Sequence, residues 1–348
     1  MDFNLPHELT EFLKNLDRFI DQEIKPLQAK DDNERFFDHR REWARTDFDN
    51  GGLPRPEWEA LLQQCKKIAD KAGFYRLSLP KEFGGQAIGN LWMSVIRDHL
   101  ASKGLGLFND LQNEHSVVGN FPIIVMLRDF GTPAQKDKFI TGQLEFKTRI
   151  TFGLTEPNHG SDATHMETKA VREVRNGVDG WLINGEKMWT TGMHTATHCA
   201  LFARTSGQPG DAKGITCFLT PTDTPGVKIE EYLWTFNMPT DHPRVSFTGV
   251  WVPEDALFGL LGSGLAVAQA FLRARAQALR RGTGAQAGHP VAAGGTGDTD
   301  RDAAPDDHKP FEHIYRHHRR YRITEGSEEI QMRTVAGHLF GYMGPGKF

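Results

Sequence analysis

Two segments in the middle of the sequence carry side chains suited to holding a flat aromatic ligand. The first is FGLTEPNHGSD at 152–162, a predicted strand and turn-rich loop with the hydroxyls of Thr155 and Ser161 and available backbone N–H groups. The second is NGEKMWTT at 184–191, where Trp189 stands beside two threonine hydroxyls. A heteroaromatic cofactor needs a stacking surface and hydrogen bonds along its polar edge. On residue chemistry alone, a hairpin loop with a core tryptophan is the favoured alternative, because short motifs are weak signals.

A third segment, TEGSEEIQ at 324–331, offers a candidate base. Glu325 stands just before a helix predicted from about residue 327 to 340. A carboxylate in a dry pocket has a raised pKa and can remove a weakly acidic proton. The alternative is an ordinary acidic residue at a helix N-terminus, with Thr324 or Ser327 as the cap.

The first 147 residues are predicted to be helical. Apolar residues recur at spacings of three and four in the ranges 9–24, 58–68, 91–100 and 117–130. Pro56 suits the first turn of the second helix, and Gly131 suits the end of the fourth. Several helices with one apolar face each must bury those faces on one another, so we expect a helical bundle.

From residue 149 to 252 the pattern changes to short β-rich runs. These runs are ITFGLT, HCALFART, ITCFLT and VSFTGVWV, separated by clusters of Gly, Pro, Asn and Asp. In the last run Val245, Phe247 and Gly249 alternate imperfectly with their neighbours. A compact antiparallel sheet or barrel is predicted for this part of the chain.

Beyond Gly262 the run LAVAQAFLRARAQALRR indicates a helix, and the pattern then ends. Residues 276–307 are rich in Gly and Ala, hold no aromatic residue, and include only Leu279 and Val291 among large aliphatics. Such a segment buries too little apolar surface to offset the entropy of ordering, so most of it is predicted to be disordered. The predicted class is α+β, with an N-terminal helical domain at 1–147, a β domain at 148–258 and an incomplete C-terminal helical domain at 259–348.

Six segments in this order resemble the successive signatures of acyl-CoA dehydrogenases. They are SLPKEFGG at 78–85, FGTPAQK at 130–136, the segments at 152–162 and 184–191, TPG at 224–226, and TEGSEEIQ at 324–331. The resemblance extends from near the N-terminus to about Arg275, and again from about His308 to Phe340. It implies a helical domain, a β-barrel and a helical bundle, in agreement with the three patterns above.

The resemblance also implies FAD as cofactor and assigns site residues. The residues implied to contact FAD are Phe152, Leu154, Thr155, Ser161, Trp189, Thr190, Thr191, Ser327 and Glu329. Among them, Thr155 is implied to bond the polar edge of the flavin, Trp189 to pack on its ring, and the two threonines after Trp189 to bond near N5. Those implied to contact the acyl-CoA are Ser161, Arg275 and Gly326, with Glu325 as the base that removes the α-proton.

The implied reaction is α,β-dehydrogenation of an acyl-CoA to a 2-enoyl-CoA, as in fatty acid β-oxidation, with electrons passing to an electron-transfer flavoprotein. An acyl-CoA oxidase is the alternative within the family. In this family the sequence motifs Arg-x-x-Phe-Gly and Gln-x-x-Gly-Gly-x-Gly hold the FAD pyrophosphate. Both motifs are absent between Arg275 and His308. A non-catalytic, unstable or partner-binding remnant is therefore the second alternative, and a homo-oligomer (dimer or tetramer) is expected only if the C-terminal domain were complete.

Composition limits the partners. The 41 basic and 45 acidic residues give a net charge of −4, which does not favour nucleic acid. No membrane span, targeting leader or metal site is expected: His313 and His317 have ligand-like spacing, but the arginines around them would repel a cation. Three scattered cysteines suit a reducing compartment. The expected protein is soluble and intracellular, cytoplasmic if bacterial and mitochondrial or peroxisomal if eukaryotic.

Overall fold

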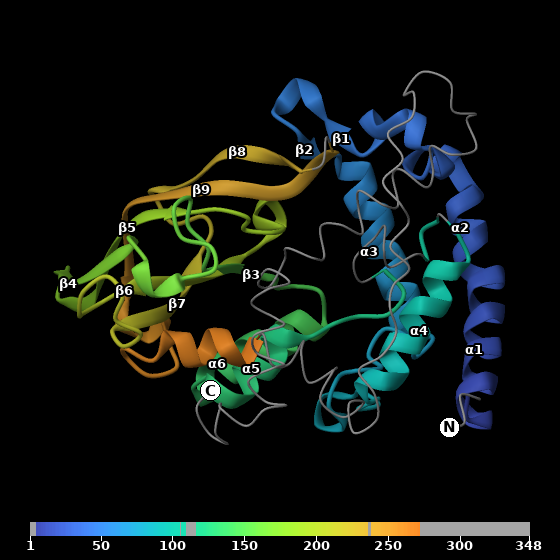
Figure 1. Ribbon diagram of the computed structural model, residues 1–348, viewed down its shortest axis with the longest axis horizontal. Helices are drawn as coiled ribbons and strands as arrows, with labels where there is room; N and C mark the ends of the chain where they lie inside the picture. The colour runs from blue at the N-terminus through green and yellow to red at the C-terminus, as the bar shows by residue number, and fades with distance from the viewer. Residues whose placement is uncertain (1–4, 105, 109–115, 236–237, 272–348) are drawn as a thin grey trace, which may run out of the picture. The chain divides into compact units, whose positions relative to one another are not determined.

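The computed structural model describes residues 5–104, 106–108, 116–235 and 238–271 (Figure 1). These residues form two compact units, each considered by itself below. The first unit comprises the described residues up to Thr46 and the range Arg55–Phe121, and the second comprises Asp47–Pro54 and the described residues from Pro122 onward. The predicted α+β class is confirmed. The domain boundaries after residues 147 and 258 stay predictions, and the segment 276–307 lies outside the described residues.

The first unit is built from helices whose apolar faces are buried. Helix α1 (His7–Phe19) continues through a π-helical turn (Ile20–Ile24) into α2 (Lys25–Ala29), and α3 (Pro56–Lys71) and α4 (Asn90–Ser102) follow. The buried side chains of α1 are Leu9, Leu13, Leu16 and Phe19. Their spacing of three and four is what the sequence predicts for one helix face, so the predicted helices at 9–24, 58–68 and 91–100 are confirmed.

The second unit contains a curled sheet. Its strands are β3 (Ile150–Gly153), β4 (Lys169–Arg175), β5 (Val178–Lys187), β6 (His198–Arg204), β7 (Ile215–Pro221), β8 (Val227–Thr235), β9 (Met238–Pro253) and β10 (Leu257–Phe258). The strand order is β10-β7-β6-β4-β5-β9-β8, and β3 pairs with β6. The predicted runs at β3, β6, β7 and β9 are confirmed. The pairing is mostly antiparallel, as expected, but β3 runs parallel to β6.

Shorter elements connect these helices and strands. A two-stranded ribbon joins β1 (Thr46–Asp47) to β2 (Leu53–Pro54). The 3₁₀ turns are Lys30–Phe36, His39–Ala44, Phe48–Asn50, Lys81–Phe83, Ala163–His165, Met193–Thr195 and Glu254–Ala256.

Strand β9 explains the imperfect alternation of its sequence. Val245 and Phe247 are buried, but beyond Gly249 the buried positions are Val250 and Val252. Gly249 has a φ of +63°, and the register between β5 and β9 shifts opposite this region. The extra residue of a bulge moves the following side chains to the other phase of the pleat, so no single alternating pattern fits the whole strand.

Helices α5 (Pro122–Phe130) and α6 (Pro133–Leu144) lie in the compact unit that contains the sheet. Helix α5 ends before Gly131 as predicted, but it begins at residue 122 and not at 117. The sequence analysis missed α6, whose Thr132 and Gln135 form a capping box. Gln135 also donates to the carbonyls of Asp255 and Leu257, both at 2.9 Å, and so ties α6 to the β10 end of the sheet.

A buried core fills each unit, and all three cysteines lie in it. Cys65 of α3 is buried in the first unit, and Cys199 and Cys217 are buried in the second. In the second unit the apolar side chains of β5, β6 and β9 pack together with Trp181 and Phe218. Residues 264–271 are helical, as predicted, and bury Val267 and Ala268.

Candidate functional site

The segments 152–162 and 184–191 lie side by side in the second unit. The first leaves the sheet at the end of β3, and the second continues from the end of β5. The Met188 N–H donates to the Thr155 carbonyl at 2.8 Å, and the Lys187 ammonium donates to the Leu154 carbonyl at 3.1 Å. The fold therefore brings Thr155 and Trp189, which are far apart in the sequence, to adjacent backbone positions.

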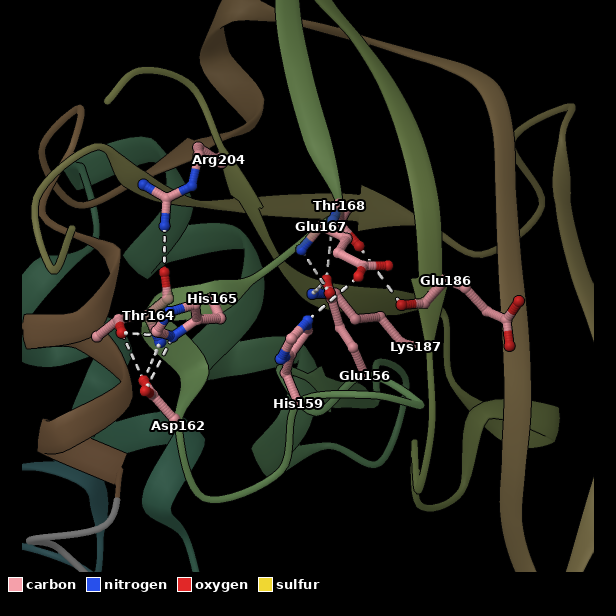
Figure 2. Close-up of polar contacts among 10 residues, drawn as sticks. All are labelled: Glu156, His159, Asp162, Thr164, His165, Glu167, Thr168, Glu186, Lys187 and Arg204. Carbon is pink, nitrogen blue, oxygen red and sulfur yellow. Dashed lines mark hydrogen bonds and ion pairs between the residues drawn. The ribbon is translucent and has the colours of Figure 1, made fainter. Parts of the chain in front are cut away.

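A buried ion pair joins the same two segments. The Lys187 and Glu156 side chains are 0% and 3% exposed, and Nζ lies 2.8 Å from Oε1. The Glu156 carboxylate also accepts the backbone N–H groups of Glu167 at 2.6 Å and Thr168 at 2.9 Å (Figure 2). Burial by itself raises the pKa of Glu156, but the Lys187 charge and the donated hydrogen bonds outweigh it and hold the pKa below its ordinary value. The sequence analysis missed both residues.

A second buried cation holds the far side of the loop that carries Ser161. The Arg204 guanidinium, in a residue only 5% exposed, donates to the Thr164 carbonyl (Figure 2). It also donates to the carbonyls of Ser206, Asp211 and Lys213. Within the loop His165 pairs with Asp162 at 2.9 Å, and His159 pairs with Glu167 at 3.2 Å. Ser161 itself is exposed.

Trp189 and its two threonine neighbours differ sharply in exposure. Trp189 is 40% exposed and has a φ of +62°, a left-handed conformation that is rare for a bulky residue and typical of functional sites. Thr190 is fully buried, and its Oγ1 has no hydrogen-bond partner among the described residues. Thr191 is exposed, and its carbonyl accepts the Thr151 hydroxyl at 2.6 Å. An exposed aromatic plane beside a buried, unsatisfied hydroxyl is an arrangement that a planar polar ligand would complete.

Phe152 packs against other rings of the protein. Its ring stacks on that of Phe271, with a centroid separation of 4.4 Å and an interplanar angle of 18°, and it also meets the ring of Phe202 at 4.9 Å. Leu154 and Thr155 are half-buried at the end of the strand. The contacts of these three residues with a flavin stay predictions.

The other residues implied by the resemblance lie outside the described residues. These are Arg275, Glu325, Gly326, Ser327 and Glu329, together with the histidines at 313 and 317. Within the described ranges, no group of three or more His, Cys, Asp and Glu side chains could hold a metal ion. None of the described helices has the length and apolar character needed to cross a membrane.

The part of the chain that carries this site is similar in sequence to known acyl-CoA dehydrogenases. Residues 151–250 match the family model described as "Acyl-CoA dehydrogenase, middle domain". Glutaryl-CoA dehydrogenase of Desulfococcus multivorans is 26% identical over 269 residues, which cover 76% of this chain and 60% of the relative. Mitochondrial isovaleryl-CoA dehydrogenase of Oryza sativa subsp. japonica is 29% identical over 205 residues, or 58% of this chain and 47% of the relative.

The fold is similar to a solved structure of an acyl-CoA dehydrogenase complexed with FAD from Bacillus anthracis. The TM-score is 0.53 at 21% identity, covering 78% of this chain and 41% of that one. The chain thus spans between 47% and 60% of the length of the two curated relatives.

Proposed function

We propose that this chain, whose residues 151–250 match the acyl-CoA dehydrogenase middle domain, uses FAD to introduce an α,β double bond into an acyl-CoA thioester. The observation that carries the proposal is the junction of Thr155 with Trp189–Thr191 inside the segment that matches the family's middle domain. The acyl group is not specified, since relatives named for glutaryl and isovaleryl thioesters are similarly close.

The described residues fit a flavin, the cofactor of this family. Trp189 offers an exposed aromatic face for ring stacking, and the Thr190 hydroxyl is buried without a partner among the described residues. Thr155 stands beside them, held through its carbonyl by Met188. We propose that these three residues contact the flavin ring, with Thr191 at its edge. Ser327 and Glu329 would supply further FAD contacts, as the resemblance implies.

Residues of the chain would remove the α-proton of the acyl-CoA and stabilise the charge that develops. An α-hydrogen next to a thioester is barely acidic, so the carbonyl oxygen must be stabilised by hydrogen bonds as negative charge develops on it. We propose that the Gly326 N–H donates one of these bonds, that Glu325 takes the α-proton, and that Ser161 and Arg275 contact the acyl-CoA. The redox chemistry, removal of the β-hydrogen as hydride, would be supplied by FAD when it is bound.

Anaerobic photometry tests the proposal directly. Addition of acyl-CoA to the flavin-loaded protein without oxygen is expected to bleach the flavin absorbance, and slow reoxidation in air would identify a dehydrogenase, for which we propose an electron-transfer flavoprotein as electron acceptor. Rapid reoxidation in air would identify an acyl-CoA oxidase instead. A panel of acyl-CoAs in the same assay defines the substrate.

The second candidate function is that of a non-catalytic remnant of the family. It is favoured by the absence of the two pyrophosphate-binding sequence motifs and by the Gly/Ala-rich segment at 276–307. A protein with only part of its FAD contacts binds the cofactor weakly, and weak binding adds little to stability. A colourless preparation that gains no visible band when FAD is added would contradict the enzyme proposal and support this alternative.

Thr190→Val is expected to separate cofactor binding from stability. Valine has nearly the same shape but no hydroxyl to leave unsatisfied, so the free energy of unfolding without FAD should stay constant or rise by about 1 kcal/mol. FAD affinity should fall, because the proposed hydrogen bond to the ring is lost. Urea unfolding and flavin titration measure the two effects.

Thr220 of β7 provides the matched control. Its hydroxyl is likewise buried without a partner among the described residues, but it does not belong to the two site segments. Thr220→Val should therefore change stability in the same direction and leave FAD affinity unchanged. Equal loss of FAD affinity in both variants would remove Thr190 from the site.

A further inference from the structure

Lys187 contacts both neighbours of Thr155. Its ammonium donates to the Leu154 carbonyl at 3.1 Å and to the Glu156 carboxylate at 2.8 Å, while Met188 bonds the Thr155 carbonyl at 2.8 Å. Three consecutive residues of one segment are thus held by two consecutive residues of the other. Because these contacts involve the two residues immediately before Trp189, they fix the position of the Trp189 backbone relative to Thr155.

The partner of Lys187 closes the loop that carries Ser161. One oxygen of the Glu156 carboxylate accepts the Glu167 N–H at 2.6 Å and the other accepts the Thr168 N–H at 2.9 Å. One carboxylate therefore joins the two ends of the loop between residues 156 and 168 (Figure 2). Among the described residues, the donors to this carboxylate are Lys187 in the second site segment and Glu167 and Thr168 at the far end of this loop.

The Lys187 side chain is fully buried, with no part of it exposed to solvent. A Cβ placed on Gly153 would lie 3.6 Å from Lys187 Cγ and only 2.8 Å from the Cys199 sulfur. Glycine at 153 thus leaves room for β3 to pass close to the Cys199 sulfur, while the Lys187 stem lies at an ordinary contact distance. The ammonium is delivered to its acceptors by a side chain packed in the β domain, and not by a surface lysine that could turn away.

A buried ion pair is a poor choice for stability alone. Taking both charges out of water costs about as much as their attraction returns, and well-packed apolar residues of similar size are often equally stable or more so. Charged hydrogen bonds are directional, whereas apolar contacts are not, so the pair can specify one arrangement of the two segments.

We propose that Lys187 and Glu156 are positioning residues that fix the distance and orientation between Thr155 and Trp189–Thr191 before the ligand binds. A site held in its binding geometry avoids the cost of ordering its parts when the ligand arrives. The identity of the ligand, FAD, rests on the proposed function, while the geometry of the ligand-free site does not.

The test uses the full chain with Glu156→Leu and Lys187→Met combined, so that neither charge is left buried alone. Amide hydrogen exchange in peptides covering 152–168 and 187–192 should become at least about tenfold faster, and FAD should bind at least about tenfold more weakly. The thermal midpoint should remain close to that of the unaltered protein, because apolar side chains fill the space.

The matched control replaces an exposed pair of the same residue types on β8. Lys228 and Glu230 lie 2.6 Å apart, with side chains 70% and 24% exposed. Glu230→Leu combined with Lys228→Met should leave exchange in the two peptides and FAD affinity unchanged. If the buried double variant fails to fold, Glu156→Gln combined with Lys187→Met replaces it, since the amide keeps the shape of Glu156 and neither charge is left buried alone; exchange and FAD affinity should then change in the same direction by a smaller factor.

Unchanged exchange in the two peptides would overturn the proposal, as would faster exchange with unchanged FAD affinity. If the unaltered protein binds no FAD, the proposed function fails and exchange alone decides: faster exchange confined to the two segments supports positioning, and unchanged or uniformly faster exchange contradicts it.

Discussion

Glu325→Gln is expected to slow flavin reduction by acyl-CoA about 10²- to 10⁴-fold, the range that a positioned base contributes. The amide has the shape of the carboxylic acid but cannot accept the proton, so acyl-CoA and FAD affinities should stay constant. Anaerobic stopped-flow absorbance measures the rate, and spectral titration measures both affinities. The assignment rests on the resemblance of residues 324–331 to the family signature.

Glu328→Gln is the control for this prediction, because Glu328 stands in the same short segment and is expected to act only as an acidic residue near a helix start. Its flavin reduction rate should remain near normal. Near-normal reduction in Glu325→Gln with a strong loss in Glu328→Gln would transfer the role of base to Glu328.

Lys187→Met alone is expected to lower the free energy of unfolding by about 3–5 kcal/mol, since it leaves the Glu156 carboxylate buried without its counter-charge. The exposed Lys228→Met should cost no more than about 1 kcal/mol. Urea unfolding at neutral pH compares the two. Adding Glu156→Leu to Lys187→Met should restore most of the loss, and a failure to restore it would show that the lysine acts through something other than the pair.

The effect of pH on the same variant follows from the carboxylate. The folded-state pKa of Glu156 is lowered from the ordinary value of 4.5, so its contribution to stability is present above that value and is lost as the pH falls through the folded-state pKa. In Lys187→Met the buried carboxylate is protonated more readily, which relieves the unpaired charge. The stability curves of the two proteins should therefore converge on acidification. Parallel curves down to the acid unfolding limb would contradict this account.

Much of the helical part could be predicted because its signal is local. Helix α1 buries residues spaced by three and four, and that spacing is visible without knowing what they pack against. Strands β4, β5 and β8 were missed. β4 exposes most of its side chains, including Val171 and Val174, so its sequence KAVREVR shows no buried face to detect.

The site was only partly predictable. Thr155 and Trp189 could be identified by residue type and motif, but the contacts that bring them together involve a lysine and a glutamate that are 31 positions apart. A charged residue in a strand is ordinarily expected to face solvent, so nothing in the sequence marks Lys187 as completely buried. The left-handed conformation of Trp189 could not be foreseen either, because bulky residues rarely adopt it.

The reactivity of the three buried cysteines should report the transient opening of each unit. Burial raises the pKa of Cys199 to about 12 and that of Cys217 well above its ordinary value. A thiol is alkylated only when it is ionised and accessible to the reagent, so these two cysteines should react only when the unit opens. Cys65 is buried in the helical unit and the other two in the sheet-containing unit. The rate of alkylation at Cys65 therefore reports the opening of the helical unit, and the rates at Cys199 and Cys217 report the opening of the sheet-containing unit. The natural sequence thus allows the opening of the two units to be measured separately.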